Sequence, residues 1–266
     1  MMTTSDLIAT KPTAMKPPTN GHPPASSRLN LRRRNSLVAG AFYLLTFISI
    51  PTLALYAGVR DPNFIVGVGP DSGVQFGAIL ELIVALAGIG TAVALFPVLK
   101  RQSEGRALGF VTSRVVEGSA IFVGVACLLT LVTLRQAGLG PDALITGRAL
   151  VAMYDRMFLV GQSFMPAVNA LLLGSLLFQS RLVPRVLPVI GLIGAPLLLA
   201  GDVAVLFGLI DRTSSPALLL AIPIALWEFS LGVWLVVKGF RPSPILFTDT
   251  RDGGVNRSLS AEAADR

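Results

Sequence analysis

The chain has 266 residues, of which 53% are hydrophobic and only 14% are charged, and its formal net charge is +7. A soluble domain carries roughly 25% charged residues, so this composition favours a membrane protein. The single cysteine, Cys127, and the single histidine, His22, exclude an intrachain disulfide, a zinc site built on several cysteines, and catalytic or haem sites that need histidine in the body of the chain. No metal and no cofactor is therefore expected.

The chain opens with a polar, proline-containing stretch over residues 1–35. Such a composition cannot bury a core, so we predict a disordered cytoplasmic tail. No apolar stretch typical of a secretory signal precedes residue 36, and the first apolar run is too long for one. Residues 241–266 return to a polar composition and are predicted to form a second disordered tail.

Six apolar runs follow one another between residues 36 and 240. A helix of roughly 20 residues crosses a bilayer, and buried helices of soluble proteins rarely run that long without polar residues at a 3.6-residue period. The sequence therefore predicts an all-α, polytopic transmembrane bundle of six helices. The predicted spans are residues 36–59, 74–99, 115–134, 157–178, 186–210 and 217–237.

Basic residues gather at alternate ends of these runs, with eleven on the side of the two tails and four on the other side. The positive-inside rule then predicts that both termini are cytoplasmic and that the chain lies in the plasma (inner) membrane. Arg32, Arg33 and Arg34 are not interleaved with the aromatic residues that stack on bases. We therefore expect the lipid bilayer, and no nucleic acid, as the partner of these charges.

The longest loop on the less basic side contains a turn, Gly140-Pro141-Asp142, that is typical of a helix start. The stretch Ala143–Met153 is apolar enough to lie on the membrane surface, or it extends the fourth span outward. Several prolines, such as Pro97 and Pro223, lie within spans. They favour kinked helix packing, and a hinge is the alternative.

Acidic residues within or at the edge of the spans are the costly feature of this chain. An ionised group at the bilayer centre costs roughly 2.5–3.5 kcal/mol, so it normally faces the bundle interior or a wet cavity. Small residues share the helix face of most of these acids, which predicts that they lie between helices. The acids are Glu81, Glu117, Asp155, Asp202 and Glu228.

Arg114 and Glu117 lie three residues apart, so they can form an ion pair on one helical turn near the inner surface. Glu81, Asp202 and Glu228 have no obvious basic partner at a matching depth, so they either carry protons or serve as inert hydrogen-bond donors. Asp155, Gln162 and Asn169 recur every seven residues and predict a polar seam on the fourth span. The candidate intramembrane polar network is Glu81, Arg114, Glu117, Gln162, Asn169, Asp202 and Glu228.

Two dipeptides, Tyr154-Asp155 and Gly201-Asp202, are similar to the Tyr-Asp and Gly-x-Gly-Asp motifs of intramembrane aspartyl proteases. A carboxylate dyad needs two such groups facing each other. Leu199 replaces the first glycine of that pattern and Asp155 is expected at the membrane edge, so a chance match is the better interpretation.

Longer segments carry a family resemblance. SRVVE at residues 113–117, SRLVPRVLPVIGLIG at residues 180–194 and WEFSLGVWLVVKGF at residues 227–240 resemble the DUF4386 family, a group of multi-span, mainly bacterial membrane proteins of unknown function. The resemblance covers nearly the whole membrane region. It implies that recurrent family positions correspond to Glu81, Arg114, Glu117, Pro184, Arg185, Glu228 and Lys238.

The sequence thus predicts an integral multi-pass membrane protein, and it leaves three specific activities open. One is a proton-linked small-solute carrier or permeability factor that uses Glu81 and Glu228 as titrating groups. Another is a structural or regulatory protein that binds itself or another membrane protein through small-residue helix faces. The third, an intramembrane enzyme, requires Asp155 and Asp202 to lie close together.

Overall fold

A computed structural model describes residues 25–243, so most of the disordered tails predicted for residues 1–35 and 241–266 lies outside this range. Within the described residues the chain is helical and contains no strand. Six helical segments are long and apolar enough to cross a membrane. This confirms the predicted all-α bundle of six transmembrane helices.

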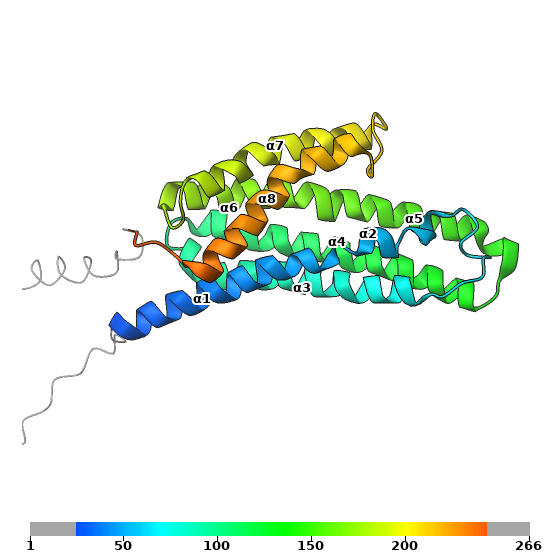
Figure 1. Ribbon diagram of the computed structural model, residues 1–266, viewed down its shortest axis with the longest axis horizontal. Helices are drawn as coiled ribbons and strands as arrows, with labels where there is room; N and C mark the ends of the chain where they lie inside the picture. Colours follow the sequence, from blue (N-terminus) through cyan, green and yellow to red (C-terminus); the bar gives the residue numbers. More distant parts are fainter. Residues whose placement is uncertain (1–24, 244–266) are drawn as a thin grey trace, which may run out of the picture.

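The first half of the chain comprises α1 (Ala25–Leu45), η1 (Thr46–Ser49), α2 (Thr52–Leu55), η2 (Gly58–Arg60), α3 (Ser72–Leu99) and α4 (Glu104–Gln136). The second half comprises η3 (Gly140–Ala143), α5 (Leu144–Met157), the π-helical segment η4 (Phe158–Phe164), α6 (Met165–Ser180), α7 (Val186–Leu206) and α8 (Ser215–Val237). Figure 1 shows the long helices running roughly along one axis, with α8 crossing beside α1 and α7.

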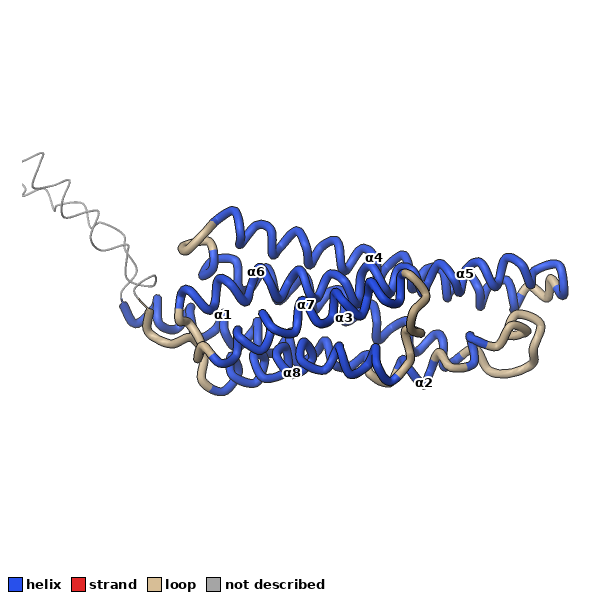
Figure 2. Tube along the Cα trace, turned by 90° about the horizontal axis from the view of Figure 1, so that it is seen from above, coloured by secondary structure: helices blue, strands red, loops and turns tan. Residues whose placement is uncertain are grey.

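The helices pack as a closed ring in the order α1, α3, α4, α6, α7, α8 and back to α1. In this ring α4 and α8 lie opposite each other, so a side chain that links them must reach across the interior. The view from above in Figure 2 shows the same set of roughly parallel helices. The ring therefore defines an interior into which polar side chains of the spans can point.

Small residues, leucine side chains and a few aromatic rings fill that interior. Ala92 and Ala170 are fully buried, as are Tyr43 and Trp227. Many leucine, isoleucine and valine side chains are exposed, which suits helices whose outer surface meets lipid tails. The packing thus places polar and small residues toward the helix contacts, as a bundle in a bilayer requires.

Several small-residue helix faces pack against other helices of the same bundle. A Cβ atom added at Gly191 would come within 2.5 Å of the Trp227 ring, and one at Gly161 would come equally close to the Ala120 Cβ atom. Gly77 lies in the same way against the Tyr56 ring. These faces fasten the helices of one chain to each other, so they are covered rather than presented to a partner protein.

Both ends of the membrane domain lie at the same end of the bundle (Figure 1). The Arg33 guanidinium of α1 donates a hydrogen bond of 2.7 Å to the carbonyl oxygen of Val236, in the last turn of α8. A side chain at the start of α1 thereby binds carbonyl groups that have no partner within α8. The even number of spans follows directly from this contact.

Three predicted span boundaries change. Helix α1 begins at Ala25, within the segment predicted to be a disordered tail, because its Arg-rich stretch continues the helix of the first span. Helix α4 begins at Glu104 instead of residue 115, since the charged residues that interrupt the apolar run do not interrupt the helix. The first span also breaks after Leu45, with Pro51 between η1 and α2.

The stretch Ala143–Met153 belongs to the fourth span. Helix α5 continues through η4 into α6, so that residues from Gly140 to Ser180 form one long helical segment. Of the two interpretations left open by the sequence, the structure therefore selects the outward extension. The surface-lying helix is not formed.

Candidate functional site

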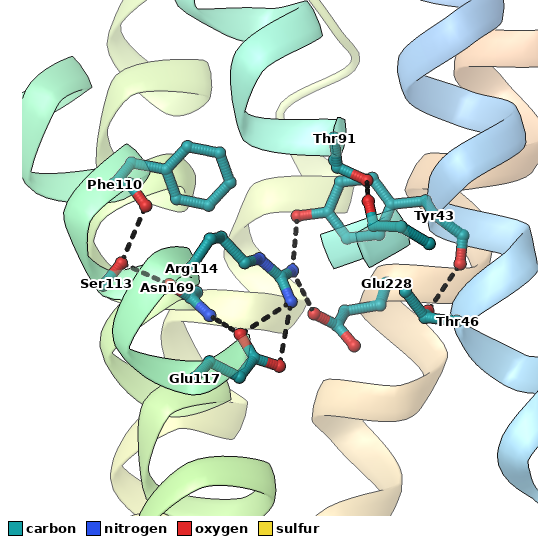
Figure 3. A network of polar contacts seen from close by, with 10 residues as sticks. Tyr43, Thr46, Thr91, Phe110, Ser113, Arg114, Glu117, Asn169 and Glu228 are labelled. Carbon is teal, nitrogen blue, oxygen red and sulfur yellow. Dashed lines mark hydrogen bonds and ion pairs between the residues drawn. The ribbon is translucent and has the colours of Figure 1, made fainter. Parts of the chain in front are cut away.

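A buried guanidinium lies between two carboxylates in the interior of the ring (Figure 3). Arg114 Nη1 is 3.0 Å from the Glu117 carboxylate, and Arg114 Nη2 is 2.7 Å from the Glu228 carboxylate. Nη2 also donates a hydrogen bond of 3.1 Å to the Tyr43 hydroxyl. Arg114 is only 2% exposed. We call Arg114, Glu117 and Glu228 the arginine triad.

The expected ion pair between Arg114 and Glu117 is thus confirmed, but the expectation that Glu228 has no basic partner is wrong. The position at which α4 begins explains the contact between Arg114 and Glu228. Because the helix begins at Glu104, Arg114 lies ten residues inside it, or about 15 Å along its axis. At that depth Arg114 can reach Glu228 near the middle of α8.

A second layer of polar contacts holds Glu117 from the neighbouring helix. Asn169 Nδ2 of α6 donates a hydrogen bond of 2.7 Å to the Glu117 carboxylate. The Asn169 side-chain oxygen in turn accepts a hydrogen bond from Ser113, which precedes Glu117 by one turn on α4 (Figure 3). The triad is therefore anchored to α1 through Tyr43 and to α6 through Asn169.

The π-helical segment η4 contacts two further acids through consecutive residues. Gln162 Nε2 donates to the Glu81 carboxylate of α3 at 3.3 Å, and Ser163 donates to Asp202 of α7. Tyr154 also donates to Glu81, at 2.9 Å. Glu81 is fully buried and makes no salt bridge among the described residues. The predicted seam thus exists for Gln162 and for Asn169 of α6, and each binds an acid.

Asp155 does not join that seam. Its carboxylate forms salt bridges with Arg60 at 3.1 Å and with Arg212 at 2.9 Å, at the end of the bundle opposite to the termini. Burial lowers the pKa of the Arg212 guanidinium, and the Asp155 carboxylate beside it opposes that shift. Asp155 is thus neutralised by arginines while Asp202 is bound by Ser163, so the structure does not support the carboxylate dyad of an aspartyl protease.

A cavity of about 310 Å³ opens beside the triad. Its wall comes mainly from η1, α2, α4, η4, α7 and α8, and its lining includes both Arg212 of the α7–α8 loop and Arg114. Of the predicted network, Arg114, Glu117, Gln162, Asp202 and Glu228 line the cavity. Glu81 and Asn169 lie behind it, each joined to a lining residue by one hydrogen bond.

The charges of this cavity do not balance. The triad holds two carboxylates against one guanidinium. Asp202 adds a third carboxylate, and its Oδ2 atom is buried without a hydrogen-bond partner. The other guanidinium of the wall, Arg212, shares the Asp155 carboxylate with Arg60. The lining therefore holds three carboxylates against two guanidiniums. The cavity therefore favours a species that brings positive charge, either a proton or a cation.

Four participants were not among the predicted site residues: Tyr43, Tyr154, Ser113 and Ser163. A tyrosine inside a membrane span could have indicated the first two, because a buried hydroxyl needs a hydrogen-bond partner. Ser163 is a small polar residue of the fourth span. Its contact with Asp202 depends on the local π-helical geometry, for which the sequence offers no simple signal.

A family model described as a domain of unknown function (DUF4386) matches residues 38–239 of this chain. No curated protein and no solved structure matches it. The matched range contains every residue of the arginine triad and of its hydrogen-bond partners.

Proposed function

We propose that this chain, which belongs to the DUF4386 family of domains of unknown function, is a proton-linked carrier of a small solute. We place it in the plasma membrane with both termini in the cytoplasm, on the basis of its basic residues. The observation that carries the proposal is the cavity that ends on the arginine triad, where two carboxylates face one guanidinium.

An unmatched charge in a membrane interior is costly. Protonation of one carboxylate removes the unmatched negative charge, and a bound solute with a positive charge neutralises it. Because both act on the same carboxylates, the occupancy of the site by solute depends on its occupancy by protons. This dependence is the physical basis of proton-linked transport.

The position and size of the cavity suit a carrier. Glu228 lies slightly beyond the middle of α8, and transporter sites lie near the bilayer midplane, where helices contribute facing side chains. A volume of about 310 Å³ holds roughly ten non-hydrogen atoms at the ~30 Å³ that one water occupies in the liquid. The solute is therefore a small molecule.

Flux measurements in proteoliposomes test this function. The probes are radiolabelled tetraethylammonium, methanesulfonate and mannitol, which are a cation, an anion and a neutral solute. We expect an imposed pH gradient to accelerate uptake of at least one probe relative to protein-free liposomes. We expect Glu228→Gln to abolish that acceleration, because it removes the unmatched carboxylate, whereas Glu104→Gln, at the exposed start of α4, leaves it intact.

The function is wrong if none of the three probes enters faster than in protein-free liposomes. It is also wrong if Glu228→Gln responds to the gradient as the unmodified chain does.

A structural role is the second candidate, and one observation favours it. Both terminal nitrogens of Arg114 are fully engaged, and the triad ties α1, α4 and α8 together. If the triad only fastens helices, Glu228→Gln lowers thermal stability and none of the probes is carried. The flux experiment therefore separates the two candidates.

A further inference from the structure

We propose that the solute bound in the cavity is a small organic cation, an ammonium ion with apolar substituents, held between Glu228 and Asp202. This inference rests on the proposed function, because it names the solute class of the same cavity. It starts from the atoms of the wall that have no partner within the described chain.

Two carboxylate oxygens of the wall are free to accept. Glu228 binds Arg114 through Oε1, and no hydrogen bond to its Oε2 is found within the described residues. Asp202 is bound by Ser163 through Oδ1, while its Oδ2 atom is buried and unpartnered, in a residue that is only 7% exposed. A buried acceptor without a partner is destabilising, so a cation that reaches Asp202 Oδ2 gives this atom the partner that the described residues do not supply.

The guanidinium groups of the wall attract an anion less strongly than the carboxylates attract a cation. Arg114 is bound to two carboxylates and Arg212 to Asp155. Both terminal nitrogens of Arg114 are used, whereas one oxygen of each acid remains available. The Nε atoms of Arg114 and Arg212 are also buried without a hydrogen-bond partner, but the three carboxylates and two guanidiniums of the lining leave it net negative. The cavity therefore favours a ligand of positive charge over an anion.

The rest of the wall excludes a bare metal ion. Calcium takes six to eight oxygen ligands and magnesium six, and no group of three or more metal-ligating side chains is found in the described part of the chain. Apolar side chains, including Ile50, Leu198 and Ile224, form much of the lining. They match the alkyl groups of an organic cation, and the Phe47 ring adds an aromatic face that favours a quaternary ammonium.

Equilibrium binding of radiolabelled tetraethylammonium to the purified full chain in lipid nanodiscs tests this inference without any gradient. We expect saturable binding that unlabelled methanesulfonate and mannitol do not displace, and that weakens at lower pH because protons compete for the same carboxylates. We expect Asp202→Asn and Glu228→Gln each to weaken binding by about tenfold or more, as loss of one partner of a buried charge contact does. The matched control is Glu104→Gln, an acid outside the cavity.

A third variant keeps every charge. Ala225 lines the cavity with an exposed side chain, so Ala225→Trp fills the space without removing an acid, and we expect it to abolish binding while thermal stability is retained. Unchanged binding in this variant, or in both acid variants, overturns the inference. Absence of binding together with gradient-driven uptake of methanesulfonate or mannitol overturns the cation and leaves the carrier standing. Binding of tetraethylammonium without gradient-driven uptake of any probe supports the cation site and overturns the carrier.

Discussion

Arg114 is the residue on which the interior of the bundle depends. Replacing it by Met leaves Glu117 and Glu228 buried and facing each other without a counter-charge. Removing one partner of a buried ion pair costs about 3–5 kcal/mol, so we expect Arg114→Met to lower the free energy of unfolding by about that amount. The midpoint of thermal unfolding of the detergent-solubilised chain measures the change.

The matched variant is Glu117→Gln. It leaves one carboxylate for one guanidinium, and the Gln side-chain oxygen still accepts the hydrogen bond from Asn169. We therefore expect a loss of only about 1 kcal/mol, the value of a typical hydrogen bond. If Glu117→Gln destabilises the chain as much as Arg114→Met does, the charge imbalance assigned to the triad is incorrect.

Local spacing revealed the ion pair of Arg114 with Glu117, because residues three apart on a helix are neighbours. It could not reveal Glu228. That contact crosses the ring from α4 to α8 and depends on where α4 begins, and the apolar run places this start eleven residues too late. Local spacing also could not reveal the hydrogen bond that Tyr43 accepts from Arg114 or the one that Tyr154 donates to Glu81, since each joins helices that are distant in sequence.

At the scale of the element, the π-helical segment η4 presents Gln162 and Ser163 to acids on two different helices. Gly161 lets it approach α4, because an added Cβ atom would come within 2.5 Å of Ala120. We expect Gly161→Ala to lower the free energy of unfolding by about 1–3 kcal/mol, the usual cost of overpacking. Thermal unfolding of the detergent-solubilised chain measures this loss of stability.

Gly105 provides the matched control, since a Cβ atom added there meets nothing within 4 Å. Gly105→Ala should leave stability unchanged or raise it by up to about 1 kcal/mol through helix propensity. Equal effects of the two substitutions would show that the close approach of η4 to α4 contributes nothing.

The existence of the six helices could be predicted from their apolar length, and the placement of the acids between helices from the small residues beside them. Glu81, for example, is buried together with Gly77 and Ala85 on α3. The π-helical turn could not be predicted, because the residues of η4 fit an ordinary α-helix equally well. Helix boundaries were least accurate where charged residues lie inside a helix, as at the start of α4.

At the scale of the whole molecule, the start of the first span and the end of the last lie side by side at one end of the bundle (Figure 1). The loop between α7 and α8 and the start of α4 then lie on opposite sides. Basic residues at the end of the termini outnumber those at the other end, and such an excess holds loops in the cytoplasm. The loop that contains Arg212 is therefore expected outside the cell.

Cysteine labelling in intact cells tests this orientation. In a Cys127→Ala background, we expect a membrane-impermeant maleimide to label Thr213→Cys directly, and Gly105→Cys only after the cells are permeabilised. Both positions are exposed, so a difference in labelling reports the side of the membrane and not burial. The opposite pattern would place the cavity entrance beside Arg212 on the cytoplasmic side, and it would reverse the direction in which a pH gradient drives the proposed carrier.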